Sequence, residues 1–221
     1  MDSSLPTLGY WNIRGLAQHI RFILAYLGVK YNDKQYTGAS DGSQHPAQEW
    51  LNEKFQLGLA FPNLPYFIET DGYSITEHTA IPIYIASKYG PQLLGETSED
   101  KANVDMIYNI LQDAKKAITQ PCYTGSKTRA ELATLCQEKA EIFQPYHEYF
   151  QFLVGDYVSH VDFYWFELIQ LMNCITEGAI LKNNQWLNDY NNRILDLTGV
   201  RDAAQSIENL TFNMKFAQIN N

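Results

Sequence analysis

The stretch TLGYWNIRGLA at residues 7–17 determines how this sequence begins to fold. Residues 8–11 form a short run that is typical of a β-strand. Apolar residues then recur at helical spacing until Gly28 ends the pattern (Leu16, Ile20, Ile23, Leu24 and Leu27). The chain is therefore expected to start with a strand followed by a helix.

A hairpin and a second helix complete the first part of the chain. After a polar stretch over residues 37–48, short β-prone runs at 66–68 and 73–75 flank an Asp71-Gly72 turn. An apolar helix is predicted over 80–89, where Gly90-Pro91 ends it. These elements predict a small α/β domain over residues 1–90.

The second part of the chain has a helical pattern throughout. Glycine and proline become sparse from Thr97 onward, and a 3.6-residue apolar period predicts a long helix that starts after Thr97 or Ser98. Ser159 and Asp162 have the spacing of a capping box at the start of a later helix. Further helices are expected over 129–150, 161–172, 185–195 and 201–207. The pattern predicts a linker near 90–97 and an all-helical domain over 97–221.

Composition and charge exclude several classes of protein. Of the 221 residues, 45% are hydrophobic and 19% are charged, which is typical of a globular protein. The net charge of -9 repels phosphate backbones and acidic membrane surfaces, so no nucleic-acid partner is expected. No apolar run approaches the ~18 residues of a membrane span, and no signal-peptide pattern is seen. We therefore expect no membrane association and a cytoplasmic location.

The cysteines give no sign of metal or redox chemistry. Cys122, Cys136 and Cys174 have neither metal-ligand nor redox spacing, which predicts reduced, packed thiols and no metal site. The α/β domain matches a thioredoxin-like layout, but its first turn contains no Cys-x-x-Cys pair. A disulfide exchanger is therefore excluded.

The residues of that turn carry a resemblance to a known family. Tyr10-Trp11-Asn12-Ile13-Arg14-Gly15-Leu16, Trp50-Leu51-Asn52-Glu53-Lys54-Phe55 and Asn63-Leu64-Pro65-Tyr66 resemble segments of the glutathione transferases, the mu class in particular. The match is strong over residues 7–90, moderate to about 172 and weak beyond. It implies the glutathione transferase fold, which is a thioredoxin-like N-terminal domain followed by an all-α C-terminal domain.

The resemblance implies that Tyr10 is the catalytic residue. In the family, this hydroxyl donates a hydrogen bond to the sulfur of glutathione. A free thiol has a pKa of about 8.5, so little thiolate is present at pH 7, although the thiolate is the attacking species. A neutral phenol stabilises the anion without competing for its proton. Without the family, Tyr10 would be interpreted as a packed aromatic residue.

Further glutathione contacts follow from the same resemblance. Trp11, Trp50 and Lys54 correspond to donors around the glycine carboxylate, although taken alone they are two packed aromatics and a solvated cation. Asn63 and Leu64 correspond to residues that bind the cysteinyl backbone as an added strand. A cis bond is expected between Leu64 and Pro65.

Several positions depart from the family pattern or belong to a partner subunit. Glu77-His78 replaces the usual Gln-Ser pair that opens a helix and binds the glutamyl end, and His78 is the poorer cap. Ala47 stands where a basic residue is usual. Asp113 corresponds to a residue that a partner subunit contributes to the glutamyl ammonium. Without the resemblance, Asp113 would be interpreted as a solvated acidic residue on the surface of a helix.

The electrophile pocket and the dimer contact are also implied by the resemblance. Ile13 and Tyr123 fit the family at the pocket, where a tyrosine hydroxyl can polarise a developing oxyanion, whereas Lys116 replaces an apolar residue. Phe61 corresponds to an aromatic residue that inserts into the helical domain of the partner, which implies a homodimer. The alternative, in which Phe61 fills the core of its own domain, remains open, as does a surface position for Tyr123.

Two functions remain open at this point. The first is a detoxifying glutathione transferase that conjugates the glutathione thiolate to small hydrophobic electrophiles, with glutathione as co-substrate and no metal. The alternative is a transferase-like, non-catalytic ligand carrier or a structural subunit of a larger assembly. Glu77-His78, Ala47 and Lys116 favour the alternative, whereas Tyr10 and Trp11 favour catalysis.

Overall fold

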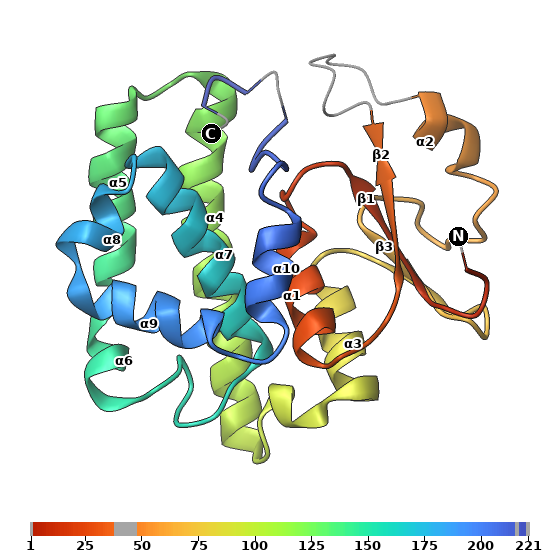
Figure 1. Ribbon diagram of the computed structural model, residues 1–221, viewed down its shortest axis with the longest axis horizontal. Coiled ribbons are helices and arrows are strands. Elements are labelled where there is room, and N and C mark those ends of the chain that lie inside the picture. The colour runs from red at the N-terminus through yellow and green to blue at the C-terminus, as the bar shows by residue number, and fades with distance from the viewer. Residues whose placement is uncertain (1, 38–47, 215–216, 220–221) are drawn as a thin grey trace.

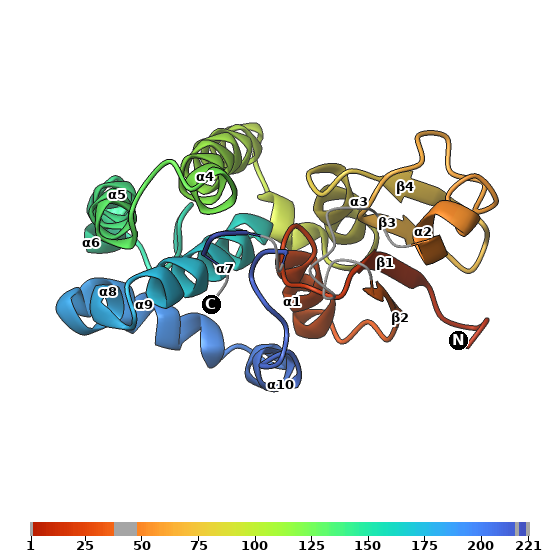
Figure 2. The same cartoon turned by 90° about the horizontal axis from the view of Figure 1, so that it is seen from above.

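The computed structural model describes residues 2–37, 48–214 and 217–219. The sheet lies on one side of the molecule and the long helices lie on the other (Figure 1). Seen from above, two helices of the first part separate the sheet from the helical part (Figure 2). The arrangement agrees with the expected α/β part followed by a helical part.

The sheet has four strands in the order β2-β1-β3-β4 among the residues described. Strand β1 (Thr7–Trp11) pairs in parallel with β2 (Asn32–Tyr36) and antiparallel with β3 (Tyr66–Ile68), which pairs with β4 (Ser74–Thr76). The predicted strand and hairpin are confirmed. The sequence pattern missed β2, because this edge strand is polar and Tyr36 is its one fully buried residue.

Three α-helices accompany the sheet in the described part of the chain. Helix α1 (Gln18–Tyr26) makes the parallel crossover from β1 to β2, and α3 (Ala80–Tyr89) follows β4, as predicted. Helix α2 (Gln48–Glu53) was not predicted, because six residues are too few for an apolar period to be recognised. A short 3₁₀ helix at Pro91–Leu94 leads from α3 into the helical part.

The helical part has one break that the sequence prediction missed. It consists of α4 (Ser98–Thr124), α5 (Arg129–Glu141), α6 (Gln144–Tyr149), α7 (His160–Ile175), α8 (Ala179–Asn183), α9 (Gln185–Leu195) and α10 (Val200–Ser206). The single helix expected over 129–150 is therefore wrong. Pro145 lacks the N–H that would continue α5 and lies instead in the first turn of α6. Helix α8 is another short element without a recognisable period.

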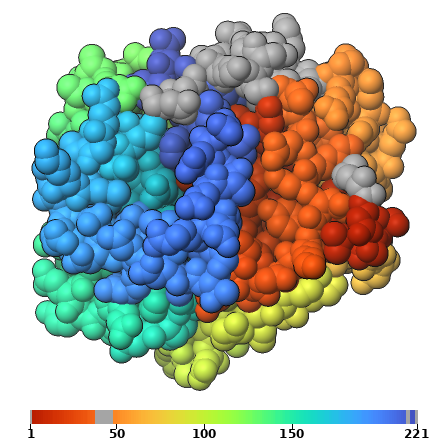
Figure 3. Space-filling model, viewed as in Figure 1, coloured from red at the N-terminus to blue at the C-terminus, as the bar shows by residue number. Residues whose placement is uncertain are grey.

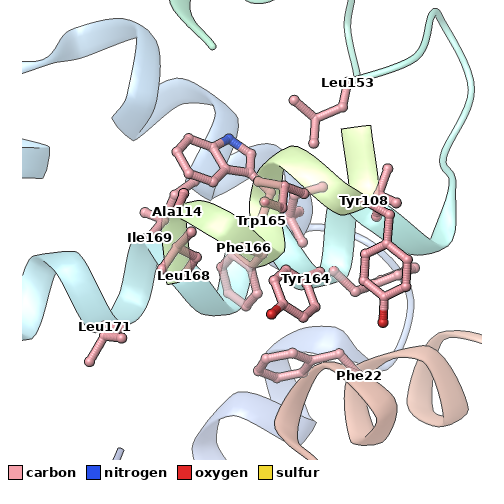
Figure 4. Close-up of a cluster of buried hydrophobic side chains, with 14 of the residues drawn as sticks. Phe22, Tyr108, Ala114, Leu153, Tyr164, Trp165, Phe166, Leu168, Ile169 and Leu171 are labelled. Atoms are coloured by element: carbon pink, nitrogen blue, oxygen red, sulfur yellow. The ribbon is translucent and has the colours of Figure 1, made fainter. Parts of the chain in front are cut away.

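Helix α7 is the centre of the hydrophobic core. Its aromatic residues Trp165 and Phe166 are both buried and point in different directions from the helix, which packs against α1, α4 and α5 (Figure 4). The rings of Phe22 on α1 and Phe166 lie 5.1 Å apart, so α7 also contacts the α/β part. One core thus joins the two parts, while the division into domains at residues 90–97 stays a prediction.

The C-terminal segment lies across the boundary between the two parts. The space-filling view shows it, in blue, against the orange surface of the α/β part (Figure 3). Helix α10 packs against α1, which accounts for this position. Within the residues described, no helix combines the length and the apolar character that a bilayer crossing requires.

The predicted capping box at α7 is present and deeply buried. The carboxylate of Asp162 accepts hydrogen bonds from the backbone N–H and the hydroxyl of Ser159, both at 2.7 Å. It also accepts from the backbone N–H of Leu153 at 2.9 Å and from the Tyr190 hydroxyl at 2.6 Å. Burial raises the pKa of Asp162, whereas these donors oppose the shift. The side chain therefore ties α7 to α9 and to the preceding loop.

Replacing Asp162 with alanine is expected to lower the free energy of unfolding by about 3 kcal/mol, because buried donors on three residues lose their acceptor. The matched control is Asp100→Ala, which removes an exposed capping-box carboxylate at the start of α4. Urea unfolding measures both variants. Equal losses would contradict the assignment of Asp162 as a link between elements.

Candidate functional site

A cavity of about 650 Å³ lies where the α/β part meets the helical part. Its walls come from the end of β1 and the turn after it, one face of α4, one face of α7 and the segment at 212–214, and Leu64 and His78 complete the lining. Of the residues predicted for the site, it brings together Tyr10, Trp11, Leu64, His78, Asp113 and Tyr123. The cavity therefore gathers residues that are far apart in the sequence.

Tyr10 lies at the end of β1 with its hydroxyl at the cavity wall. The side chain is 5% exposed, and its Oη accepts a hydrogen bond from the backbone N–H of Leu16 at 3.1 Å. Burial raises the pKa of Tyr10 to about 12, so the phenol is neutral at pH 7. Because the bond to Leu16 uses an oxygen lone pair, the hydroxyl proton is available to a second partner.

The turn that holds Leu16 requires glycine at position 15. Gly15 has a φ of +41°, in the left-handed region. A Cβ atom built there would lie 2.7 Å from the Oη of Tyr10. The glycine thus lets the backbone approach the phenol closely.

The predicted cis bond between Leu64 and Pro65 is confirmed. Leu64 lines the cavity, and Pro65 is buried behind it. Asn63 is exposed, and its side-chain amide donates a hydrogen bond to Oε1 of Glu77 at 2.9 Å. The residue predicted to bind the cysteinyl backbone and a residue predicted to bind the adjoining glutamyl end are therefore in contact with each other.

The predicted donors for the glycine carboxylate have different surroundings. Trp11 is half-buried at the cavity wall. Trp50 is buried and stacks on Tyr66, with ring centroids 6.1 Å apart and an interplanar angle of 21°. Lys54 is half-buried, with its ammonium 5.4 Å from the Phe55 ring. Their contacts with glutathione stay predictions, and Ala47 lies outside the described residues.

Glu77 and His78 precede α3 but do not cap it. The N-cap position is Thr79, so the expectation that His78 takes the place of a capping serine is wrong. His78 is half-buried rather than exposed, and its backbone carbonyl accepts from His19 Nε2 and Tyr108 Oη at 3.2 and 3.0 Å. Burial and then the Lys115 charge lower the pKa of His78 to about 4. Its imidazole is therefore neutral at pH 7.

The remaining predicted pocket residues differ in exposure. Asp113 is exposed on α4 at the cavity. Tyr123 is half-buried, and its hydroxyl accepts from the backbone N–H of Met214 at 3.1 Å. Ile13 is buried in a small core cluster with Tyr10. Direct contact between Ile13 and an electrophile stays a prediction.

The segment at 211–214, which follows α10, forms backbone hydrogen bonds with the turn that carries Gly15. The backbone N–H groups of Arg14 and Gly15 donate to the carbonyls of Thr211 and Phe212 at 2.8 and 3.0 Å. The Arg14 guanidinium also lies 4.2 Å from the centre of the Phe212 ring. This wall of the cavity is thus fixed to the turn beside Tyr10.

Sequence reasoning missed the charged residues inside the cavity wall. Lys115 is 8% exposed and donates to the backbone carbonyl of Gly15 at 2.7 Å. Glu167 is buried on α7 and forms an ion pair with Arg14 at 2.5 Å. A signal was present, because both charges occur on otherwise apolar helix faces. Lys115 lies between the buried residues Leu111 and Ile118 at helical spacing.

Comparison with known proteins connects this geometry to a family. The family model "Glutathione S-transferase, N-terminal domain" matches residues 6–87. The chain is 35% identical to mouse glutathione S-transferase Mu 2 over an alignment of 202 residues. This alignment covers 90% of each chain. It is 39% identical over 185 residues to human glutathione S-transferase Mu 4, covering 80% of this chain and 83% of the relative. The chain belongs to the mu-class glutathione S-transferases.

Solved structures of glutathione S-transferases have the same fold. A Pi-class enzyme of Onchocerca volvulus superposes with a TM-score of 0.82 at 21% identity, covering 96% of this chain and 99% of that one. The glutathione S-transferase Blo t 8 gives a TM-score of 0.80 at 24% identity, covering 97% and 100%. The expected glutathione transferase fold, with its thioredoxin-like and all-α parts, is confirmed. Among the described residues of this transferase, no group of three acidic, histidine or cysteine side chains is placed to hold a metal.

Gly15→Ala is expected to displace the Tyr10 hydroxyl, because the added methyl group overlaps it and the backbone angle disfavours any side chain. Turnover with glutathione should fall at least about tenfold, since a displacement near 1 Å at a reacting centre is costly. Gly28→Ala is the control. The φ of Gly28 is also positive, at +65°, but no atom lies within 4 Å of a Cβ added there. Equal losses of activity in both variants would contradict a specific clash at Tyr10.

Proposed function

We propose that this transferase activates glutathione through the neutral hydroxyl of Tyr10 and conjugates it to small hydrophobic electrophiles. The observation that carries the proposal is the position of Tyr10, which is buried at the cavity wall. Its hydroxyl oxygen accepts a hydrogen bond from the backbone N–H of Leu16, so the hydroxyl proton can be donated to the sulfur. A donor placed where negative charge accumulates stabilises the thiolate.

The reaction balances without a proton acceptor on Tyr10. The thiol of bound glutathione loses its proton to solvent, and the Tyr10 hydroxyl donates a hydrogen bond to the resulting anion while it stays protonated. The sulfur then forms a bond to an electrophilic carbon. With an aryl halide, the halide leaves with the bonding electron pair. Binding both reactants in one cavity supplies the proximity.

The remainder of glutathione would lie along the edge of the α/β part. Trp11, Trp50 and Lys54 are proposed for the glycine carboxylate, to which an indole N–H and an ammonium are suited as donors. Asn63 and Leu64 are proposed for the cysteinyl backbone. Glu77 accepts from Asn63, which supports a glutamyl end held beside both residues.

The electrophile would occupy the helical side of the cavity. Leu171, Phe212 and Met214 supply apolar surface there, and Tyr123 lies among them at the wall. The hydroxyl of Tyr123, which accepts a bond from the backbone N–H of Met214, is proposed to polarise a developing electrophile oxygen. A detoxifying role and a cytoplasmic location are part of the same proposal.

A homodimer is supported by the exposure of Phe61. This side chain is 79% exposed, so it does not fill the core of its own domain. A large exposed aromatic suits insertion into a partner. Asp113 of the partner subunit would then reach the glutamyl ammonium, since a two-fold interface delivers it to both sites.

Tyr10→Phe is expected to raise the pKa of the bound glutathione thiol by about one unit or more, with nearly unchanged glutathione affinity, because only the bond to the anion is lost. Ultraviolet titration of the thiolate measures this. Tyr123→Phe is the control and should leave that pKa unchanged. An unaltered pKa in Tyr10→Phe would show that Tyr10 has only a packing role.

Phe61→Ala is expected to weaken the dimer by ~2 to 4 kcal/mol, the range for removing a buried aromatic anchor. Sedimentation over a dilution series measures the dissociation constant. Phe55→Ala is the matched control, because Phe55 is also 79% exposed. A monomeric wild type at micromolar concentration, or equal weakening in both variants, would contradict the proposed contact.

Glutathione titration calorimetry together with a turnover assay on an activated aryl halide tests the function as a whole. The proposal requires both binding and turnover. Binding without turnover would favour a ligand carrier or structural subunit instead. No binding at millimolar glutathione would exclude both glutathione roles.

A further inference from the structure

A single peptide group connects a buried lysine to the Tyr10 hydroxyl. The peptide lies between Gly15 and Leu16, at the turn that follows β1. Its carbonyl oxygen accepts a hydrogen bond from Lys115 Nζ at 2.7 Å. Its N–H donates to Tyr10 Oη at 3.1 Å. The ammonium, the peptide and the phenol therefore form one continuous chain of hydrogen bonds.

Lys115 is held in this position by its surroundings. It is 8% exposed on the buried face of α4, and its ammonium lies 5.1 Å from the centre of the Tyr164 ring on α7. Burying an ammonium is costly unless acceptors compensate for the lost water. The carbonyl of Gly15, 100 residues away in sequence, is such an acceptor. The contact therefore fixes the ammonium to the catalytic turn.

The charges around Lys115 leave it bonded to the peptide rather than to a carboxylate. Glu167 on α7 faces it, but the carboxylate of Glu167 is engaged by Arg14 through both oxygens. His19 on α1 and His78 also face Lys115, and burial lowers the pKa of both imidazoles. Burial lowers the pKa of Lys115 to about 8, while Glu167 opposes this shift. The lysine is thus predominantly cationic at pH 7.

A cation at one end of such a chain strengthens the bonds along it. The ammonium polarises the Gly15 carbonyl, which makes the N–H of Leu16 a stronger donor to Tyr10. Cooperative strengthening is roughly 10–30% per bond in condensed-phase estimates. Withdrawal of electron density from the phenol oxygen makes its O–H a stronger donor in turn. The strengthened donor, the Tyr10 hydroxyl, is the group proposed to bind the sulfur on which the thiolate charge develops.

We propose that Lys115 is a positioning residue that lowers the pKa of bound glutathione by polarising the Gly15–Leu16 peptide and, through it, the Tyr10 hydroxyl. The inference rests on the proposed role of Tyr10 and adds a residue that acts on it from α4. Lys115 does not need to touch the sulfur in this arrangement.

Ultraviolet titration of the glutathione thiolate in the full-length protein tests the proposal. Lys115→Met should raise the thiol pKa by about half a unit, because the polarising charge is removed. Lys115→Arg should restore most of the effect, since it keeps a cationic donor for the carbonyl. Lys116→Met is the matched control, because Lys116 lines the same cavity but is exposed. A shift of the same size in Lys116→Met would overturn the proposal.

A double-mutant cycle separates this chain from a direct effect of the ammonium on the sulfur. In a Tyr10→Phe background, Lys115→Met should produce little further shift, because the last bond of the chain is absent. A shift as large as in the wild type would mean a through-space field and would overturn the proposal.

The outcomes also distinguish this inference from the proposed function. If Tyr10→Phe raises the thiol pKa and Lys115→Met does not, only the role of Lys115 fails. If Tyr10→Phe has no effect, both fail. Where Lys115→Met does not fold, Lys115→Gln replaces it as a neutral variant that can still donate to the carbonyl. A rise in the pKa of the bound thiol is again expected, because the charge is absent.

Discussion

The burial of α7 between both parts of the molecule is the constraint on which the site depends. Its aromatic residues pack on α1 on one side and on α4 on another, so the turn after β1 and the cavity face of α4 are held in one fixed relation. Asp162 fixes the start of α7 by accepting bonds from two other regions of the chain. Because protein interiors are densely packed, a shift of α7 would displace the cavity walls that pack against it.

The same packing brings the residues proposed for catalysis together at one short turn. Tyr10 is the penultimate residue of β1, a strand that is paired on both sides, and Gly15 allows the peptide before Leu16 to approach the Tyr10 hydroxyl. Lys115 and Glu167 reach this turn from two helices of the other part. The α/β part thus supplies the phenol, whereas the helical part supplies the charges that surround it.

Much of this was predictable from sequence, for identifiable reasons. The long helix after Thr97 is predicted by its apolar periodicity, whereas the cis bond before Pro65 and the proposed role of Tyr10 follow from the family resemblance of the segments that contain them. Strand β2 has no recognisable sequence pattern, because its pairing with β1 rather than an apolar alternation makes it a strand. Lys115 stands out only as a charge on an apolar face. Its partner is 100 residues away, and no local rule specifies that distance.

The bonds between the C-terminal segment and the turn at Arg14 have a kinetic consequence. Phe212 and Met214 form a wall of the cavity, and the backbone of the same segment is bonded to the two residues before Leu16. An outward movement of this wall must break those bonds and so loosen the turn that orients Tyr10. The release of a bulky conjugate and the loss of thiolate activation would then share one conformational barrier.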